Sequence, residues 1–201
     1  MAISFVSFVA TGGGAAEPAG VLSGDVLVAV ALSNTVSAPG GPAGWAQAGT
    51  TLTVGANTAN AWTIARGGSA PSYAWTNVGS GGVNVYAFRG ASSTLDAVAT
   101  GTATSAVAPS VNASAATDWL VCLYVDNASA AITAPAGMTE PGTPAAFGAG
   151  AYLALSASGA TGTKTFGGTT TPLGAWSIAL AVLAVPSSSH AFYGKRRWFL
   201  S

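Results

Sequence analysis

The chain has 201 residues, of which 50% are hydrophobic and only 6% are charged, with a formal net charge of zero. The high hydrophobic content excludes a chain that is disordered because of low hydrophobicity. The low charge argues against a helical protein, because the solvent-exposed faces of soluble helices usually carry charged residues. The length fits one domain, or one domain followed by a tail. With 27 glycines and many Ala, Ser and Thr residues, the composition favours strands joined by tight turns.

Several short segments are predicted to be β-strands, because most are rich in β-branched or aromatic residues and are bounded by Gly, Pro, Asn or Ser. In chain order they are residues 2–10, 24–32, 59–66, 71–77, 82–90, 117–127, 150–158, 163–168 and 175–185. The apolar runs DVLVAVAL and WLVCLYV are typical of strands buried on both sides. In VNVYAF the alternation places Val83, Val85 and Ala87 on one face.

The sequence also repeats itself at an offset of 93 residues. Residues 24–45 align without a gap with residues 117–138, and eight of the 22 positions are identical. The identical pairs are Asp25/Asp118, Leu27/Leu120, Val28/Val121, Asn34/Asn127, Ala38/Ala131, Pro42/Pro135, Ala43/Ala136 and Gly44/Gly137. The repeat predicts two related halves of about four strands each, residues 1–93 and 94–186, followed by a tail.

One domain is expected to contain both halves, because a half of this length buries little surface alone and no linker separates the two. We predict a jelly-roll-like antiparallel β-sandwich over residues 1–186, in which the two halves interleave. A two-sheet sandwich of another topology is the alternative. Residues 187–201 are predicted to form an extended C-terminal arm, called the arm below.

Residues that could carry chemistry are few, and the sequence predicts a protein that is not an enzyme and holds no metal or cofactor. The single histidine, His190, lies in the arm, and the acids are scattered. Asp25 and Asp118 each precede an apolar strand, where an aspartate satisfies backbone amides in a turn. Asp118, Asp126 and Asn127 could bind calcium if loops brought them together. Cys122, the only cysteine, is expected to be a core residue.

The tryptophans of the predicted sandwich have two interpretations. They can fill the core or a seam between subunits, or they can line a groove that binds sugars. The residues concerned are Trp45, Trp62, Trp75, Trp119 and Trp176. Trp45, in the turn PAGW, is predicted to be the most exposed of them and is the candidate ligand-binding residue.

The arm is the most unusual part of the sequence, because its last seven residues carry three positive charges while residues 1–194 carry a formal charge of −3. Large aromatic residues flank the charges, and aromatic residues and arginine dominate binding hot spots. We expect the arm to dock on a neighbouring subunit; a nucleic-acid-binding arm, a membrane-surface segment and a disordered terminus are the alternatives. The predicted partner-binding residues are Phe192, Tyr193, Lys195, Arg196, Arg197, Trp198 and Phe199.

Residues 19–45, AGVLSGDVLVAVALSN…GPAGW, resemble a pattern of small β-sandwich virion proteins of tailed bacteriophages and prophages, in which a strand follows GD and a P-x-G-W turn follows the strand. The segment VYAFRGASSTLDA resembles the same proteins more loosely. Such proteins occur as minor tail, head-fibre or decoration proteins and in gene-transfer-agent-like particles.

The resemblance implies a non-enzymatic, multimeric virion component, assembled in the host cytoplasm, whose partners are copies of itself and other virion proteins. The alternative is a carbohydrate-binding module that recognises host-surface glycans. A nucleic-acid partner is not expected. Neither is a membrane partner, because the N-terminus lacks the charged region of a signal peptide and the longest apolar stretch, residues 176–185, is about half a membrane span.

Overall fold

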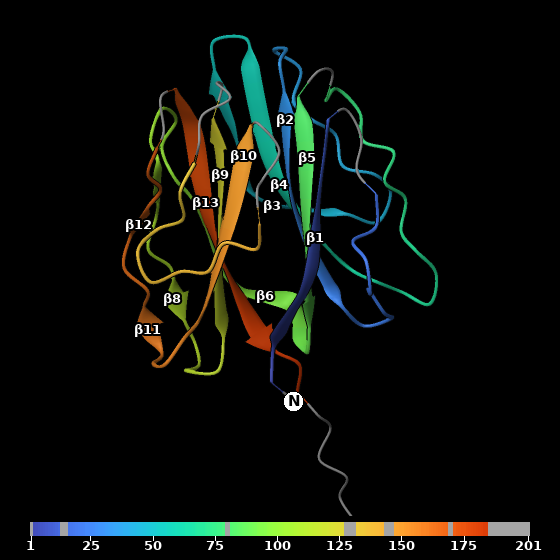
Figure 1. The fold of residues 1–201 in the computed structure, drawn as a ribbon, viewed down its shortest axis with the longest axis vertical. Helices are drawn as coiled ribbons and strands as arrows, with labels where there is room; N and C mark the ends of the chain where they lie inside the picture. Colours follow the sequence, from blue (N-terminus) through green and yellow to red (C-terminus); the bar gives the residue numbers. More distant parts are fainter. Residues whose placement is uncertain are drawn as a thin grey trace, which may run out of the picture.

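The computed structural model describes residues 2–12, 16–78, 81–126, 132–142, 147–168 and 171–184, all in strands, turns and loops (Figure 1). The arm, residues 187–201, lies outside the described residues. The strands of the first sheet are β1 (Ser4–Gly12), β2 (Val26–Ser33), β3 (Ala46–Val54), β4 (Asn57–Ala65) and β5 (Gly82–Arg89). Those of the second are β6 (Ala91–Thr100), β9 (Trp119–Asp126), β10 (Gly148–Ala154) and β13 (Pro172–Val182). Two short pairs complete the described strands: β7 (Val107–Ala108) with β12 (Lys164–Thr165), and β8 (Asn112–Ala113) with β11 (Gly159–Ala160).

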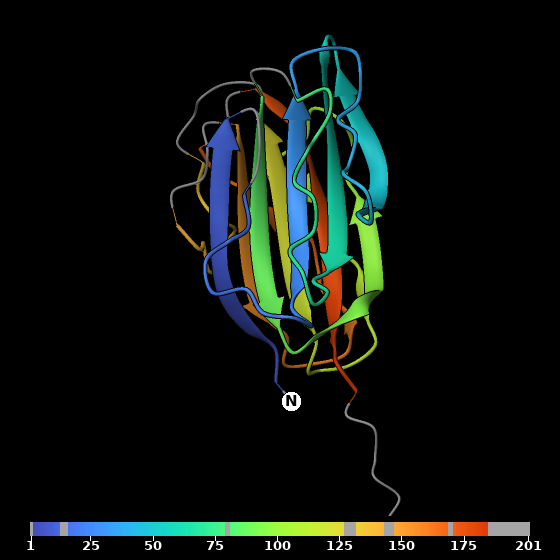
Figure 2. The same cartoon turned by 90° about the vertical axis from the view of Figure 1, so that its right-hand side faces the viewer.

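The two main sheets pack face to face, and every strand pairing in them is antiparallel. The first sheet has the order β1-β5-β2-β4-β3, which can be followed across Figure 2, and the second has the order β10-β9-β13-β6. The prediction of an antiparallel, two-sheet β-sandwich is therefore confirmed.

The predicted interleaving of the two halves is wrong. All five strands of the first sheet come from residues 4–89, and all four strands of the second come from residues 91–182. The chain changes sheet once, at Gly90, where φ is +79° and an added Cβ would meet the Ala2 carbonyl oxygen at 2.5 Å. Since a jelly roll draws each sheet from both halves, the strand order observed here is a different one.

The two sheets nevertheless repeat one pattern of connections. The order β1-β5-β2-β4 in the first sheet corresponds to β6-β13-β9-β10 in the second. β2 and β9 coincide residue for residue at the offset of 93 found in the sequence. Among the described residues β3 has no full counterpart; an isolated bridge between Thr139 and Tyr152 lies where a strand beside β10 would begin.

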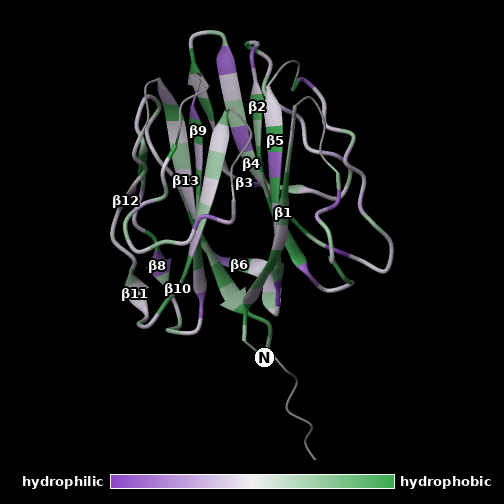
Figure 3. Ribbon diagram, viewed as in Figure 1, coloured by the Kyte–Doolittle hydropathy of each residue, from purple (hydrophilic) through white to green (hydrophobic). Residues whose placement is uncertain are grey.

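Apolar side chains form three clusters, one between the sheets and one on the outer face of each sheet. Loops run over both outer faces, as the ribbons in Figures 1 and 3 show. β2 contributes Val28 to the central cluster and Leu27 to an outer one, and all its residues are buried. The prediction that β2 and β9 are buried on both sides is thus confirmed for β2 and, apart from the half-buried Trp119, for β9. Val83, Val85 and Ala87 share the outer face, as predicted.

Two strands of the main sheets escaped the sequence analysis, as did the two-residue strands β7, β8 and β11, and two predicted strands are mostly loop. β3 and β6 are rich in Ser, Thr and Ala and lie at sheet edges, where half-exposed strands carry few large apolar residues. The predicted strand at 71–77 contributes a single bridge, Gly40 to Thr76, and that at 163–168 contributes only β12 and a bridge to Thr133.

Candidate docking groove

Asp25 and Asp118 hold equivalent turns, one before β2 and one before β9. The backbone N–H of Leu22 donates to Oδ2 of Asp25 at 2.8 Å, and that of Ala115 donates to Oδ2 of Asp118 at 3.0 Å. Each aspartate also donates its own N–H to the carbonyl oxygen three residues earlier. The predicted turn role of both aspartates is therefore confirmed.

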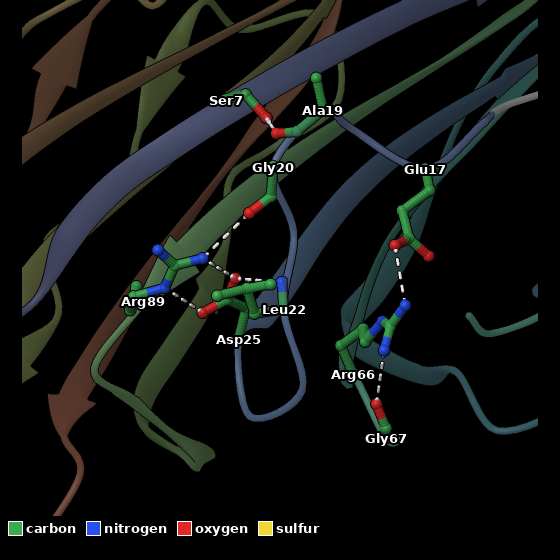
Figure 4. Close-up of polar contacts among 9 residues, drawn as sticks. All are labelled: Ser7, Glu17, Ala19, Gly20, Leu22, Asp25, Arg66, Gly67 and Arg89. Carbon is green, nitrogen blue, oxygen red and sulfur yellow. Dashed lines mark hydrogen bonds and ion pairs between the residues drawn. The ribbon is translucent and has the colours of Figure 1, made fainter. Parts of the chain in front are cut away.

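The surroundings of Asp25 supply a cation, as Figure 4 shows. Nε and Nη2 of Arg89 donate to the two carboxylate oxygens of Asp25 at 2.9 and 2.8 Å. Nη2 also donates to the Gly20 carbonyl oxygen at 3.0 Å. Close by, Arg66 pairs with Glu17 at 3.2 Å. Two ion pairs thus fix the segment before β2 against the first sheet.

The surroundings of Asp118 are different. Val182 stands 93 residues after Arg89, and its backbone N–H donates to Asp118. The second neighbour is the carboxyl group of Asp96, which accepts the N–H of Ser114 at 2.6 Å. Burial, together with the charge of Asp96, raises the pKa of Asp118, while the hydrogen bonds from Ser114 lower the pKa of Asp96. Within the described residues neither carboxylate forms an ion pair.

An open groove lies beside Asp118, at the end of the sandwich where the chain enters β1 and leaves β13; we call this the exit end. Its volume is about 540 Å³, within the range of sites that take a ligand of a few rings. Its main lining residues are Ala2, Ile3, Thr117, Trp119, Leu155 and Val182. Backbone segments from both sheets therefore form its walls.

An aromatic cluster supports one wall of the groove. Trp119 stacks on Tyr152 at 5.3 Å between ring centroids and meets Phe88 edge to face, and Tyr152 stacks on Phe5 at 4.9 Å. The four rings come from β1, β5, β9 and β10, so they join the two sheets and hold Trp119 in place.

Further apolar surface lies at the same end of the molecule. Leu22, in the turn before β2, is 57% exposed, and Leu183, directly after β13, is 45% exposed. The ribbon around the end of β13 and the start of the chain carries the hydrophobic colour in Figure 3. An exposed apolar surface beside a groove is characteristic of an interaction site.

Trp45 is buried, so the prediction that it is the most exposed tryptophan is wrong. Only 7% of it is exposed; its Nε1 donates to the Ser72 carbonyl oxygen at 3.0 Å, and its ring packs on Trp75 and Tyr73. The turn that carries it folds over the outer face of the first sheet and covers Ala29 and its neighbours. As arranged here, the ring has no free face for a sugar.

The condition for calcium binding, that loops bring Asp118 and Asp126 together, is not met. Asp118 precedes β9 and Asp126 ends it, so roughly 25 Å of strand separates them. Asp126 accepts hydrogen bonds from Tyr124 and Thr171. Asn127 lies outside the described residues, as do His190 and the partner-binding residues predicted in the arm.

Sequence analysis did not single out the groove residues Ile3 and Val182, or Asp96. Trp119 appears there with the other tryptophans, as a core or seam residue or as part of a sugar-binding groove. The repeat carried a usable signal, because aligning Arg89 with Val182 shows that the cation beside the first aspartate has no counterpart beside the second.

The chain matches no protein-family model, no curated protein and no solved structure. The part of the chain that the structure describes contains no helix of the length and apolarity that a membrane span needs. Functional inference therefore starts from the groove, the repeat and the resemblance of residues 19–45.

Proposed function

We propose that the protein is a non-enzymatic structural subunit of a phage or phage-like particle, of the surface, fibre, decoration or minor-tail type. It assembles with copies of itself and with other virion proteins in the host cytoplasm and docks through its arm. The observation that carries this proposal is the apolar groove at the exit end, which is lined by Val182, two residues before the last described residue, Ala184, and therefore close along the chain to the basic and aromatic arm.

The use of the polar residues supports a structural role. Asp25 and Asp118 hold turns, Asp126 binds the segment before β13, and the Cys122 thiol is buried beside the Ser177 hydroxyl at 3.6 Å. With so little charge on the surface, the chain has weak electrostatic protection against association, which suits a subunit that packs against neighbours.

The molar mass of the full chain in solution, measured by light scattering over a wide concentration range, tests the proposal. We expect a defined multiple of 19.4 kDa, and a lower mass for a full-length variant with Phe192→Ala and Trp198→Ala in the arm. Lys164→Ala, a change in the body, serves as the control. A wild-type chain that stays monomeric throughout the range contradicts self-assembly.

A further inference from the structure

The surface that receives the arm can be assigned, on the basis of the proposed function. We propose that the groove beside Trp119 and Asp118 binds the arm of a second copy, and that two copies exchange their arms about a twofold axis. Three properties of the exit end carry this assignment: its charge, its apolar lining and the place where the chain leaves it.

The comparison between the two halves shows what the groove lacks. In the first half Arg89 donates two hydrogen bonds to Asp25. In the second half Val182 stands in the place of Arg89, and no cation of the described residues pairs with Asp118. Asp96 adds a second carboxyl group at the same spot. The second half therefore keeps a buried carboxyl group, 1% exposed, that has no guanidinium beside it among the described residues, and its negative charge lies close to the groove-lining residues Thr117 and Trp119 in the chain.

The remaining charges of the body agree with a basic partner. Of its three basic residues, Arg66 and Arg89 are paired with Glu17 and Asp25. With all residues counted, residues 1–194 hold six acids and three bases, a formal charge of −3. One of those acids, the buried Asp118, stands between the groove-lining residues Thr117 and Trp119, while the arm carries Lys195, Arg196 and Arg197. Such complementary charges steer association and set its specificity.

The apolar lining suits the other residues of the arm. The groove offers Ile3, Leu155 and the half-buried ring of Trp119, which the aromatic cluster holds in position. Its volume of about 540 Å³ has room for more than one aromatic side chain. The arm brings four such side chains around its basic triplet: Phe192, Tyr193, Trp198 and Phe199.

The position of the arm favours exchange between copies. Val182 lines the groove and ends β13, which runs out of the body at the exit end (Figures 1 and 2). Phe192 follows Ala184 by eight residues, a reach of up to about 28 Å. A chain that continues in the direction of β13 leads away from its own groove. When two exit ends face each other, each copy offers a groove and an arm, and the contact closes at two copies.

Substitutions in the full-length chain can separate the contribution of the groove from that of the arm. Ala116→Arg adds a cation at the exposed rim of the groove, where it repels the arm. Ser23→Arg is the matched control, because Ser23 is the exposed residue at the same position of the 93-residue repeat in the turn before β2. The paired substitutions Arg196→Ala and Arg197→Ala remove most of the positive charge of the arm and leave the groove intact.

Native mass spectrometry and light scattering then measure the molar mass, and hence the number of copies, of each variant in solution. We expect wild type and Ser23→Arg at twice 19.4 kDa, and the groove variant and the arm variant each as monomers. Mixing the two monomeric variants restores dimers with one copy of each, because the intact arm of one enters the intact groove of the other. Having one contact in place of two, these mixed dimers dissociate at least about tenfold more readily than wild type.

Other results overturn the assignment in distinguishable ways. If the groove variant dimerises like wild type, the groove is not the receptor, although self-assembly stands. If no mixed dimers form, the arms are not exchanged in this way. If wild type is monomeric and Ala116→Arg lowers its stability at unchanged mass, each arm occupies its own groove, and both the exchange and the proposed self-assembly fail.

Discussion

Asp25 and Asp118 occupy the same position of the 93-residue repeat and hold the same turn, yet of the two only Asp25 pairs with a guanidinium in the described part of the chain. The difference arises from one position, Arg89 in the first half and Val182 in the second. The duplicated turn thus holds a closed ion pair in the first half, whereas in the second half it holds a buried carboxyl group that has no cation among the described residues and stands between the groove-lining residues Thr117 and Trp119.

Replacing each aspartate by asparagine should separate these two roles. Asp25→Asn weakens two charge-assisted hydrogen bonds to Arg89 and should lower the free energy of unfolding by about 1–3 kcal/mol. Asp118→Asn should cost less, because no cation is lost and the new amide can donate to the Asp96 carboxylate. Urea denaturation at neutral pH measures both, and an equal or larger loss at position 118 would refute the asymmetry.

Acidic pH should act on Asp118 and Asp96 in opposite directions. The raised pKa of Asp118 means that the folded chain binds a proton there at a pH where the unfolded chain, with its ordinary value of 3.8, does not. Lowering the pH from 7 therefore stabilises wild type relative to Asp118→Asn, until both states are protonated below 3.8.

The lowered pKa of Asp96 has the opposite sign. Its contribution to stability is complete above 3.8 and is lost as the pH falls through the folded value. Urea denaturation of wild type, Asp118→Asn and Asp96→Asn at a series of pH values checks both trends. A wild-type advantage over Asp118→Asn that shrinks on acidification would contradict the pairing of the two carboxyl groups.

A pair of bridges tests whether the halves are structural repeats. Gly40 bridges Thr76 in the first half, and Thr133 bridges Gly167 in the second, with the two residue types exchanged. A Cβ at Gly40 would lie 2.3 Å from Oγ1 of Thr76, so Gly40→Thr should destabilise the chain by about 1–3 kcal/mol. Adding Thr76→Gly reproduces the arrangement of the second half and should recover most of the loss.

The double-mutant cycle for these two positions gives the coupling energy. Thr76→Gly alone is the control and should cost about 0.5–1 kcal/mol, through the added freedom of the unfolded chain. Strictly additive effects, with no recovery in the double variant, would show that the two bridges are not interchangeable.

The buried thiol offers a probe of opening. Burial raises the pKa of Cys122 to about 11, so the reactive thiolate is scarce at neutral pH, and the sandwich shields the sulfur. A thiol reagent should label the urea-unfolded chain within minutes and the native chain at least about a hundredfold more slowly. Rapid labelling under native conditions would mean that β9 is not held between its two apolar layers.

Much of the architecture could be predicted because the composition of the central strands indicates directly that they are buried. The continuous apolar runs of β2 and β9 can only suit strands covered on both faces, and the offset of 93 residues survives in their matching places. The edge strands β3 and β6 gave no such signal, since Ser, Thr and Ala are equally at home in loops. The sequence could not show whether the two halves share their sheets, because this depends on whether the chain passes from one sheet to the other at the single turn around Gly90.

The site was less predictable than the fold. Trp45 lies in a turn that sequence rules place at the surface, but that turn folds back over the outer face of the first sheet and buries the ring. The groove combines Ile3, Trp119 and Val182, residues far apart in the chain that only the packing of the two sheets brings together. The one sequence signal near the groove is that Arg89 of the first half aligns with Val182, a groove residue, in the second half.

The most direct test of the central claim is mass spectrometry of phage-like particles, induced from cells that carry this gene and purified on a density gradient. We expect peptides of this chain in the particle band, at a fixed ratio to the other particle proteins and resistant to a high-salt wash. Absence of the chain from intact particles, while it is abundant in the cell lysate, would contradict a role as a virion subunit.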